Sequence, residues 1–240
     1  MKSLVDLTAI VTGAGSGIGR GVALALADQG VHVVVSGRRE LKIEETAETI
    51  RKNGAEVLAV QADVSQPEDV DRLVKTTLER FGSIDILINN AGIGGSGPIH
   101  AHDIATWNRV LDVNLSGAFL MTRAVLPSMR TQESGHIINI SSESGLEYYL
   151  GSGAYGVSKH ALNALGEYTV RENQELNIRV NTICPGMVVT EMSADAPGLD
   201  HKKCLYPEDI ADLVIWLLTR RSNIKIGTPI LIQTMQNPWS

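Results

Sequence analysis

Short runs of apolar, β-branched residues alternate along the chain with longer stretches in which apolar positions recur at helical spacing. The pattern predicts strands at 8–11, 31–35, 57–60, 84–88, 136–140, 178–183 and 229–232, and helices near 17–29, 40–53, 67–80, 103–130, 153–173 and 207–219. The predicted strands are apolar throughout rather than alternating, as is typical of parallel strands buried on both faces. We therefore expect an α/β fold with a doubly wound, seven-stranded parallel sheet and helices on both of its faces.

The 240 residues, 43% of them hydrophobic and 20% charged, are enough to bury a complete core. We expect a single domain over 1–240, because α/β folds of this size are routinely undivided. An irregular stretch at about 190–206, which contains Pro197 and Gly198, shows no clear periodicity and is the predicted substrate loop.

Charge and cysteine content narrow the possible partners and the compartment. A formal net charge of −6 disfavours a nucleic-acid partner. The two cysteines fit a reducing compartment, and no Cys/His cluster with metal-ligand spacing is seen, so no metal is predicted. No stretch approaches the roughly 18 apolar residues that span a bilayer, and the apolar run near the N-terminus contains Asp6. A cytoplasmic protein without a membrane partner is expected.

A glycine-rich segment, Thr12-Gly13-Ala14-Gly15-Ser16-Gly17-Ile18-Gly19, follows the first predicted strand and opens the first predicted helix. Glycines there allow a tight turn and close approach of the backbone to a pyrophosphate, which the helix N-terminus favours through free N–H groups. The alternative is a glycine-rich turn without a ligand. Strand, spacing and helix together favour a dinucleotide site in a Rossmann-type fold.

The second predicted strand ends in Gly37, Arg38 and Arg39. Enzymes that use NAD usually place an acid here to bind the ribose 2′-hydroxyl, whereas guanidinium groups suit a 2′-phosphate. We therefore predict NADP(H) rather than NAD(H), with Arg38 as the principal contact. The alternative is a solvated basic turn.

Tyr155 and Lys159 stand four residues apart, and Ser142 lies thirteen residues before the tyrosine. On a helix, a Tyr-x-x-x-Lys pair places both side chains on one face. An ammonium beside a phenol favours the phenolate and lowers the pKa of the phenol. A nearby hydroxyl can hold a substrate oxygen, so the three residues suit proton transfer to or from a carbonyl or alcohol oxygen.

Further motifs occur in a fixed order along the chain: Asn89-Asn90-Ala91-Gly92 after the fourth strand, Asn114 in the long fourth helix, and Pro185-Gly186, followed by Thr190, after the sixth strand. With the T-G-x-x-x-G-x-G loop and the Y-x-x-x-K pair, they resemble the motifs of the short-chain dehydrogenase/reductase family. The resemblance covers nearly the whole chain. The tail departs from it, since the family's last strand usually ends near Asp-Gly-Gly.

The resemblance implies roles for the catalytic candidates. Tyr155 would be the general acid/base, and Lys159 would lower its pKa and hold the ribose of the nicotinamide. Ser142 would polarise the substrate oxygen. Asn114 would support a water chain from the lysine to solvent, or brace the helix against a strand.

The resemblance also implies a set of cofactor contacts. Asp63 would bind the adenine amino group, although it could equally cap the turn 63–65, and Thr190 with its neighbours would grip the nicotinamide carboxamide. The implied set comprises Gly13, Ser16, Gly17, Ile18, Gly19, Arg38, Arg39, Asp63, Val64, Asn90, Ala91, Gly92, Tyr155, Lys159, Pro185, Gly186, Val188 and Thr190.

The expected activity is hydride transfer between NADP(H) and a small-molecule carbonyl or secondary alcohol. A 3-oxoacyl thioester reductase and a general ketone or sugar reductase both fit the chain. A catalytically silent NADP(H)-binding sensor or scaffold is the alternative, although it would normally lack the tyrosine or the lysine. An epimerase or dehydratase would usually need a larger substrate domain.

Apolar residues are frequent along 110–129, more frequent than one core-facing stripe requires. They are Val110, Leu111, Val113, Phe119, Met121, Val125 and Met129. A homodimer through the long helices is therefore expected, or a homotetramer if the altered tail still forms a second interface.

Overall fold

The computed structural model describes residues 3–194 and 196–239. Its sheet has seven parallel strands in the order β3-β2-β1-β4-β5-β6-β7. The strands are β1 (Thr8–Thr12), β2 (His32–Gly37), β3 (Val57–Gln61), β4 (Ile86–Asn89), β5 (Gly135–Ile140), β6 (Ile178–Pro185) and β7 (Ile230–Ile232). The predicted doubly wound α/β fold is confirmed.

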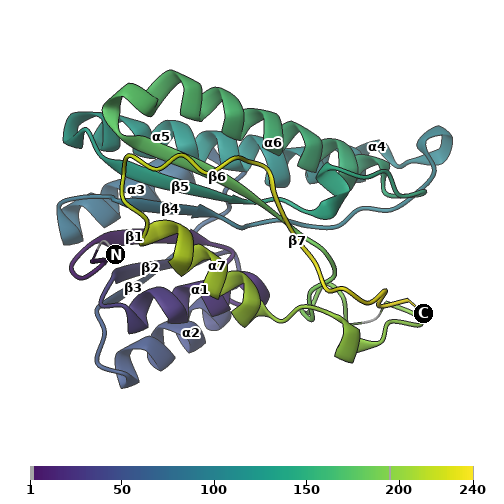
Figure 1. Cartoon of the computed structure of the whole chain (residues 1–240), viewed down its shortest axis with the longest axis horizontal. Helices are drawn as coiled ribbons and strands as arrows, with labels where there is room; N and C mark the ends of the chain where they lie inside the picture. The colour runs from purple at the N-terminus through teal and green to yellow at the C-terminus, as the bar shows by residue number, and fades with distance from the viewer. Residues whose placement is uncertain (1–2, 195, 240) are drawn as a thin grey trace.

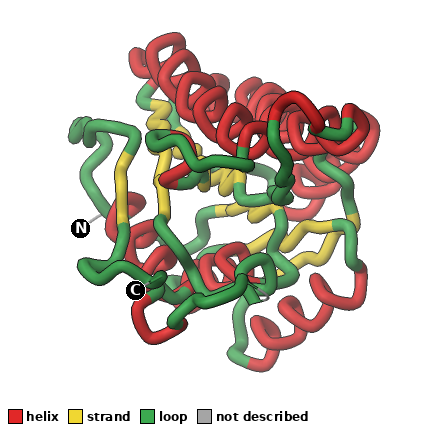
Figure 2. The backbone as a smooth tube through the Cα atoms, turned by 90° about the vertical axis from the view of Figure 1, so that its right-hand side faces the viewer, coloured by secondary structure: helices red, strands yellow, loops and turns green. Residues whose placement is uncertain are grey.

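The helices form a layer on each face of the sheet (Figures 1 and 2). They are α1 (Gly17–Asp28), α2 (Glu40–Lys52), α3 (Pro67–Phe81), α4 (Ile104–Leu111), α5 (Gly117–Gln132), α6 (Gly153–Asn173) and α7 (Pro207–Leu218). In Figure 1, α1, α2 and α7 lie below the sheet, and α4, α5 and α6 lie above it. Among the described residues, no helix is long and apolar enough to cross a membrane.

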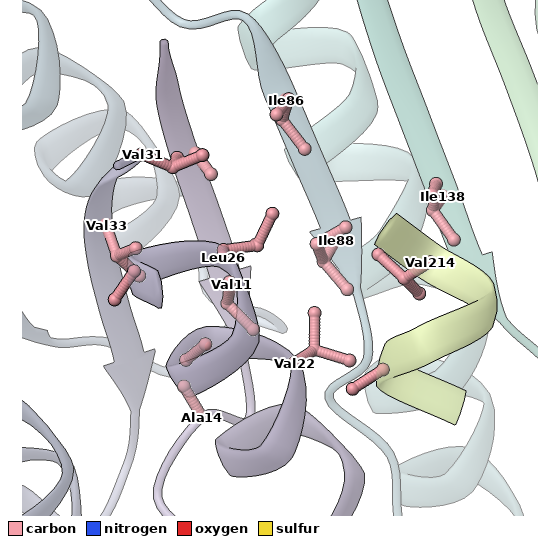
Figure 3. Packing of buried hydrophobic residues seen from close by; sticks show 14 of the residues in the cluster. Val11, Ala14, Val22, Leu26, Val31, Val33, Ile86, Ile88, Ile138 and Val214 are labelled. Carbon is pink, nitrogen blue, oxygen red and sulfur yellow. The ribbon is translucent and has the colours of Figure 1, made fainter. Parts of the chain in front are cut away.

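Each face of the sheet has its own hydrophobic core. Successive residues of a strand point to opposite faces of the sheet. Val11, Val33 and Ile88 pack against α1 and α7 on one face. Ile10 and Leu87 pack against α3 and α5 on the other face. Figure 3 shows the first of these cores, where side chains of α1 and α7 meet the strands. Burying each such side chain stabilises the fold by about 1.5–3 kcal/mol.

The chain order reverses between β1 and β4, which lie side by side at the centre of the sheet. The connections that follow these strands lead to opposite faces, and ligands bind α/β sheets in the crevice that this divergence leaves. The Asn90 side chain spans the crevice, donating to the carbonyl oxygens of Thr12 at 2.9 Å and Gly13 at 3.2 Å. The glycine-rich loop is thereby held against the end of β4.

The helix predicted at 103–130 is interrupted. A π-helical turn, η2 (Asp112–Ser116), separates α4 from α5. The Asn114 amide bonds the backbone of Ile93 and the hydroxyl of Ser158, and Gly117 packs so closely that a Cβ there would lie 2.6 Å from Cγ2 of Val64. These contacts depend on tertiary packing, which helical periodicity does not report. Wide turns of this kind are frequent at functional sites.

The predicted substrate loop after β6 is irregular except for a short 3-10 turn, η5 (His201–Lys203); its Asp195 lies outside the described residues. The chain beyond β7 packs against this loop, near the C-terminus in Figure 1. The Asp200 amide donates to the Pro238 carbonyl at 2.9 Å, and the Thr234 hydroxyl donates to the Lys203 carbonyl at 2.7 Å. The loop and the tail therefore form one packed unit.

The apolar residues of 110–129 face the chain's own core more than was expected. Val110, Val113, Met121, Val125 and Met129 are all buried, and Phe119, at 48% exposure, is the large apolar side chain of this stretch that faces solvent. The surplus that suggested a helix-mediated dimer is thus mostly absorbed within one chain. A homodimer or homotetramer stays a prediction.

Candidate active site

A pocket of about 560 Å³ runs from the glycine-rich loop to Tyr155 and Lys159. It lies at the carboxyl ends of β1, β4 and β5, in the crevice described above. Of the predicted cofactor residues, those in its wall are Gly13, Ser16, Gly17, Ile18, Arg38, Arg39, Asp63, Val64, Asn90, Ala91, Gly92, Tyr155, Lys159 and Thr190. Sequence positions 13 to 190 thus converge on one elongated cavity.

The glycine-rich loop fits a dinucleotide pyrophosphate. Gly13 and Gly17 have φ of +65° and +52°, which favour glycine, and a Cβ on Gly13 would lie 2.8 Å from the Asn90 side chain. Ser16 precedes α1 without a side-chain cap, so the first N–H groups of that helix are left for an anionic ligand.

Two arginines at the end of β2 differ in how they are held. The Arg39 guanidinium donates to Glu191 at 2.7 Å and to the Ser16 hydroxyl at 3.0 Å. The exposed Arg38 also lines the pocket, and within the described chain its side chain has no polar partner. Arg38 is therefore the arginine whose guanidinium is available to a phosphate.

Asp63 caps its own turn, the alternative that the sequence left open. Its carboxylate accepts from the Ser65 amide at 3.0 Å and pairs with Arg109 at 2.7 Å. Partial burial acts to raise the pKa of Asp63, but hydrogen bonds from Arg109 and Ser65 hold it below its ordinary value. Sequence reasoning missed Arg109, because nothing in the local pattern links a residue of α4 to the end of β3.

Three of the four catalytic candidates lie together: Ser142 just after β5, and Tyr155 and Lys159 in the first turns of α6. The hydroxyl groups of Ser142 and Tyr155 are hydrogen-bonded to each other. The Lys159 ammonium donates to the Ile140 carbonyl at 2.9 Å and lies 5.5 Å from the centroid of the Tyr155 ring. A carbonyl oxygen placed beside the two hydroxyls would meet donors from both.

The pKa of Tyr155 lies above its ordinary value in this structure, and a lowering of that pKa by Lys159 stays a prediction. Burial raises the pKa of Tyr155 above its ordinary value, and the nearby acidic groups of Cys184 and Glu143 act in the same direction. Burial also lowers the pKa of Lys159 to about 8, and its ammonium points to the Ile140 carbonyl. Tyr155 is therefore a protonated phenol at neutral pH, the form that can donate a proton.

The burial of Lys159 has a measurable consequence for stability. A shift from 10.5 to about 8 corresponds to roughly 3 kcal/mol of destabilisation. Methionine would take the ammonium donor away from the Ile140 carbonyl, and a buried acceptor that loses its donor costs about 1 kcal/mol. Lys159→Met should therefore raise the free energy of unfolding at pH 7 by about 2 kcal/mol. Denaturant titration measures this change, and Lys75→Met at an exposed site is the control.

The same substitution has a defined pH dependence. Below pH about 8 the lysine is protonated in the folded and the unfolded chain, so the full cost is present. Between about 8 and 10.5 the unfolded chain binds more protons, and the stability of the unsubstituted protein rises relative to the variant. The stability advantage of Lys159→Met should shrink over this range. An advantage that did not change with pH would contradict a buried ammonium.

Asn114 braces the site. Its side-chain oxygen accepts from the Ile93 amide at 2.8 Å, and its NH₂ donates to the Ile93 carbonyl at 3.0 Å and to Ser158 at 3.1 Å. The bracing role is thus present in the structure. The water-chain role stays a prediction.

Some predicted cofactor residues lie outside the pocket wall. Gly19 packs against the carbonyl of Gly13, and Pro185 ends β6. Gly186 donates its amide to Ile232 at 2.8 Å, and the Val188 side chain is buried in the core. Among the residues predicted after β6, Thr190 is the one that faces the pocket.

Sequence reasoning also missed Glu143, which directly follows Ser142. The carboxylate is half-buried and accepts a hydrogen bond from the Tyr149 hydroxyl. The neighbouring Tyr148 instead stacks on His160 at 5.0 Å. The one sequence feature that could have identified Glu143 is its place next to Ser142, and this does not show which way the side chain points.

Within residues 3–194 and 196–239, no group of three or more His, Cys, Asp or Glu residues could hold a metal ion. Both cysteines are buried free thiols, and burial raises the pKa of Cys184.

The sequence is similar to those of a known protein family. Residues 7–198 match the family model described as short chain dehydrogenase. An uncharacterized oxidoreductase of Staphylococcus saprophyticus is 43% identical over 228 residues, which cover 95% of this chain and 97% of that protein. One from Staphylococcus aureus strain MRSA252 is 38% identical over 227 residues, with the same coverage of 95% and 97%.

The fold is also similar to those of two solved enzyme structures. Levodione reductase superposes with a TM-score of 0.90 at 31% identity, covering 96% of this chain and 97% of that chain. An alcohol dehydrogenase from the archaeon Thermococcus sibiricus, complexed with 5-hydroxy-NADP, superposes with a TM-score of 0.88 at 28% identity, covering 97% and 98%. Both similarities extend over nearly the full length of the chains.

Proposed function

The chain belongs to the short-chain dehydrogenase family, and from this premise we propose that it reduces the carbonyl group of a small molecule with NADPH, or oxidises the corresponding secondary alcohol with NADP⁺. The observation that carries the proposal is the continuous pocket, which joins a pyrophosphate-type loop to Tyr155 and Lys159, with Tyr155 hydrogen-bonded to Ser142. A dinucleotide along this cavity would have one end at the arginines and the other at the tyrosine.

Ser142, Tyr155 and Lys159 each have a proposed role that follows from their position. Ser142 holds the substrate oxygen, and Tyr155 donates its hydroxyl proton to that oxygen as the carbonyl carbon is reduced. Lys159 balances the charge of the phenolate, because it is buried and its ammonium lies 5.5 Å from the centroid of the Tyr155 ring. When bound, NADPH supplies the hydride and leaves as NADP⁺.

NADPH is favoured over NADH by the basic end of the pocket. Arg38, Arg39 and Lys42 all line it, and guanidinium groups match the geometry of a phosphate. The solved alcohol dehydrogenase neighbour carries an NADP derivative, which supports the same choice.

A silent NADP(H)-binding sensor is the competing function. It is disfavoured because the serine, tyrosine and lysine are all present and the two hydroxyl groups are hydrogen-bonded. We further propose that the protein works in the cytoplasm as a homo-oligomer.

The test is NADPH oxidation by the purified protein across carbonyl classes. The panel comprises levodione, acetoacetyl thioesters, steroid ketones and open-chain sugars, each measured with NADPH and with NADH. We expect turnover with at least one class and a higher kcat/KM with NADPH. Tight NADPH binding without turnover on any carbonyl would favour the sensor instead.

A further inference from the structure

Glu143 directly follows Ser142 at the end of β5, close enough to Tyr155 for its charge to act on the pKa of that phenol. Strands β5 and β6 are neighbours, with Ile140 opposite Ile183, so the residues three positions further on, Glu143 and Gly186, leave the same edge of the sheet. A carboxylate oxygen of Glu143 lies 3.1 Å from where a Cβ on Gly186 would stand. The carboxylate therefore sits between Ser142 and the loop that follows β6, where a substrate would extend beyond its carbonyl.

The carboxylate has unused capacity to accept hydrogen bonds. A carboxylate offers about four lone-pair sites, and the side-chain donor that the described residues bring to Glu143 is the Tyr149 hydroxyl. The group is half-buried, and its charge acts on the pKa of Tyr155. Partial burial strengthens both its attraction for a donor and its repulsion of another anion.

We infer that Glu143 selects, among carbonyl substrates, those that carry a hydroxyl or ammonium group next to the reacting carbonyl, and that it excludes those with a carboxylate there. The inference rests on the proposed reductase function and names its substrate class. With its oxygen held by Ser142 and Tyr155, a substrate would have its adjacent carbon within reach of Glu143, which directly follows Ser142. Tyr149 holds the carboxylate in place.

The experiment uses one ketone skeleton with four different groups on the carbon next to the carbonyl: ammonium, hydroxyl, methyl or carboxylate. For the unsubstituted protein we expect kcat/KM to fall in that order. Hydrogen bonds to charged groups contribute about 1.5–3 kcal/mol, so the ammonium and carboxylate ketones should differ by at least about tenfold.

Glu143→Gln removes the charge and keeps the shape. The ammonium-to-carboxylate ratio should fall by at least about tenfold. The ratio is the readout because removing a charge that acts on the pKa of Tyr155 changes the rate with every ketone alike. Glu147→Gln, which removes an exposed carboxylate from the same loop, should leave the ratio unchanged. An unchanged ratio in Glu143→Gln, or a preference of the unsubstituted protein for the carboxylate ketone, would overturn the inference.

Glu143→Asp separates charge from packing, because it keeps the carboxylate and shortens its reach. It should still discriminate against the carboxylate ketone, and loss of that discrimination would also overturn the inference. Calorimetric binding of the four matching secondary alcohols to each variant provides a readout that needs no turnover. If no ketone is reduced, the proposed reductase function fails, while the alcohol binding ratios still decide the role of Glu143.

Discussion

Replacing Tyr155 by phenylalanine should lower kcat/KM for carbonyl reduction by roughly 10³-fold, within the range of about 10² to 10⁴ typical of a lost general acid. The phenol is the proposed proton donor, because burial keeps it protonated by raising its pKa and it is hydrogen-bonded to Ser142. Phenylalanine keeps the ring that packs near Lys159. NADPH binding should therefore be unchanged.

Steady-state kinetics and a fluorescence titration of NADPH measure the two effects separately. Tyr148→Phe is the matched control, because this phenol is 88% exposed and stacks on His160 outside the pocket; it should leave both quantities unchanged. Near-normal turnover by Tyr155→Phe would show that another group donates the proton.

Replacing Arg38 by alanine should weaken NADPH binding by about 10- to 100-fold, since a charge-assisted hydrogen bond to phosphate contributes about 1.5–3 kcal/mol. NADH lacks the 2′-phosphate, so its affinity should change little. Arg39→Ala is the comparison, because its guanidinium already pairs with Glu191 and Ser16. We expect a smaller loss of NADPH affinity there.

Equilibrium titrations of both cofactors against the two variants give the required affinities. Two outcomes would contradict the assignment to Arg38. One is an equal loss of NADH and NADPH affinity in Arg38→Ala, which would indicate a change in the pocket as a whole. The other is a larger loss of NADPH affinity in Arg39→Ala.

The fold could be predicted from the sequence because local residue patterns identify its strands and helices. Apolar strand runs and the glycine-rich segment between β1 and α1 depend on neighbouring residues, and the structure confirms the sheet they imply. The predicted ends of the elements were less accurate. The strand predicted at 84–88 is β4, Ile86–Asn89, because pairing with β1 and β5 determines where this strand begins and ends.

Features that depend on tertiary contact could not be predicted in this way. The π turn at Asn114 is bonded to Ile93 and Ser158, which lie on separate segments of the chain. The pKa of Tyr155 depends on how deeply the phenol is buried, and the spacing of Tyr155 and Lys159 contains no such information. The spacing in the sequence identified Tyr155 and Lys159 as candidates, but their pKa values depend on how deeply the fold buries them.

The contact between the substrate loop and the tail bears on how this protein can change over evolution. The family model ends at residue 198, whereas the bonds that join loop to tail involve Asp200, Lys203 and Thr234. If the loop lines the substrate site as proposed, a mutation in the tail reshapes that wall while the glycine-rich loop and Tyr155 stay untouched. Under the proposed function, descendants of this chain would acquire new substrates through changes in their last forty or so residues and would keep the residues proposed for hydride transfer.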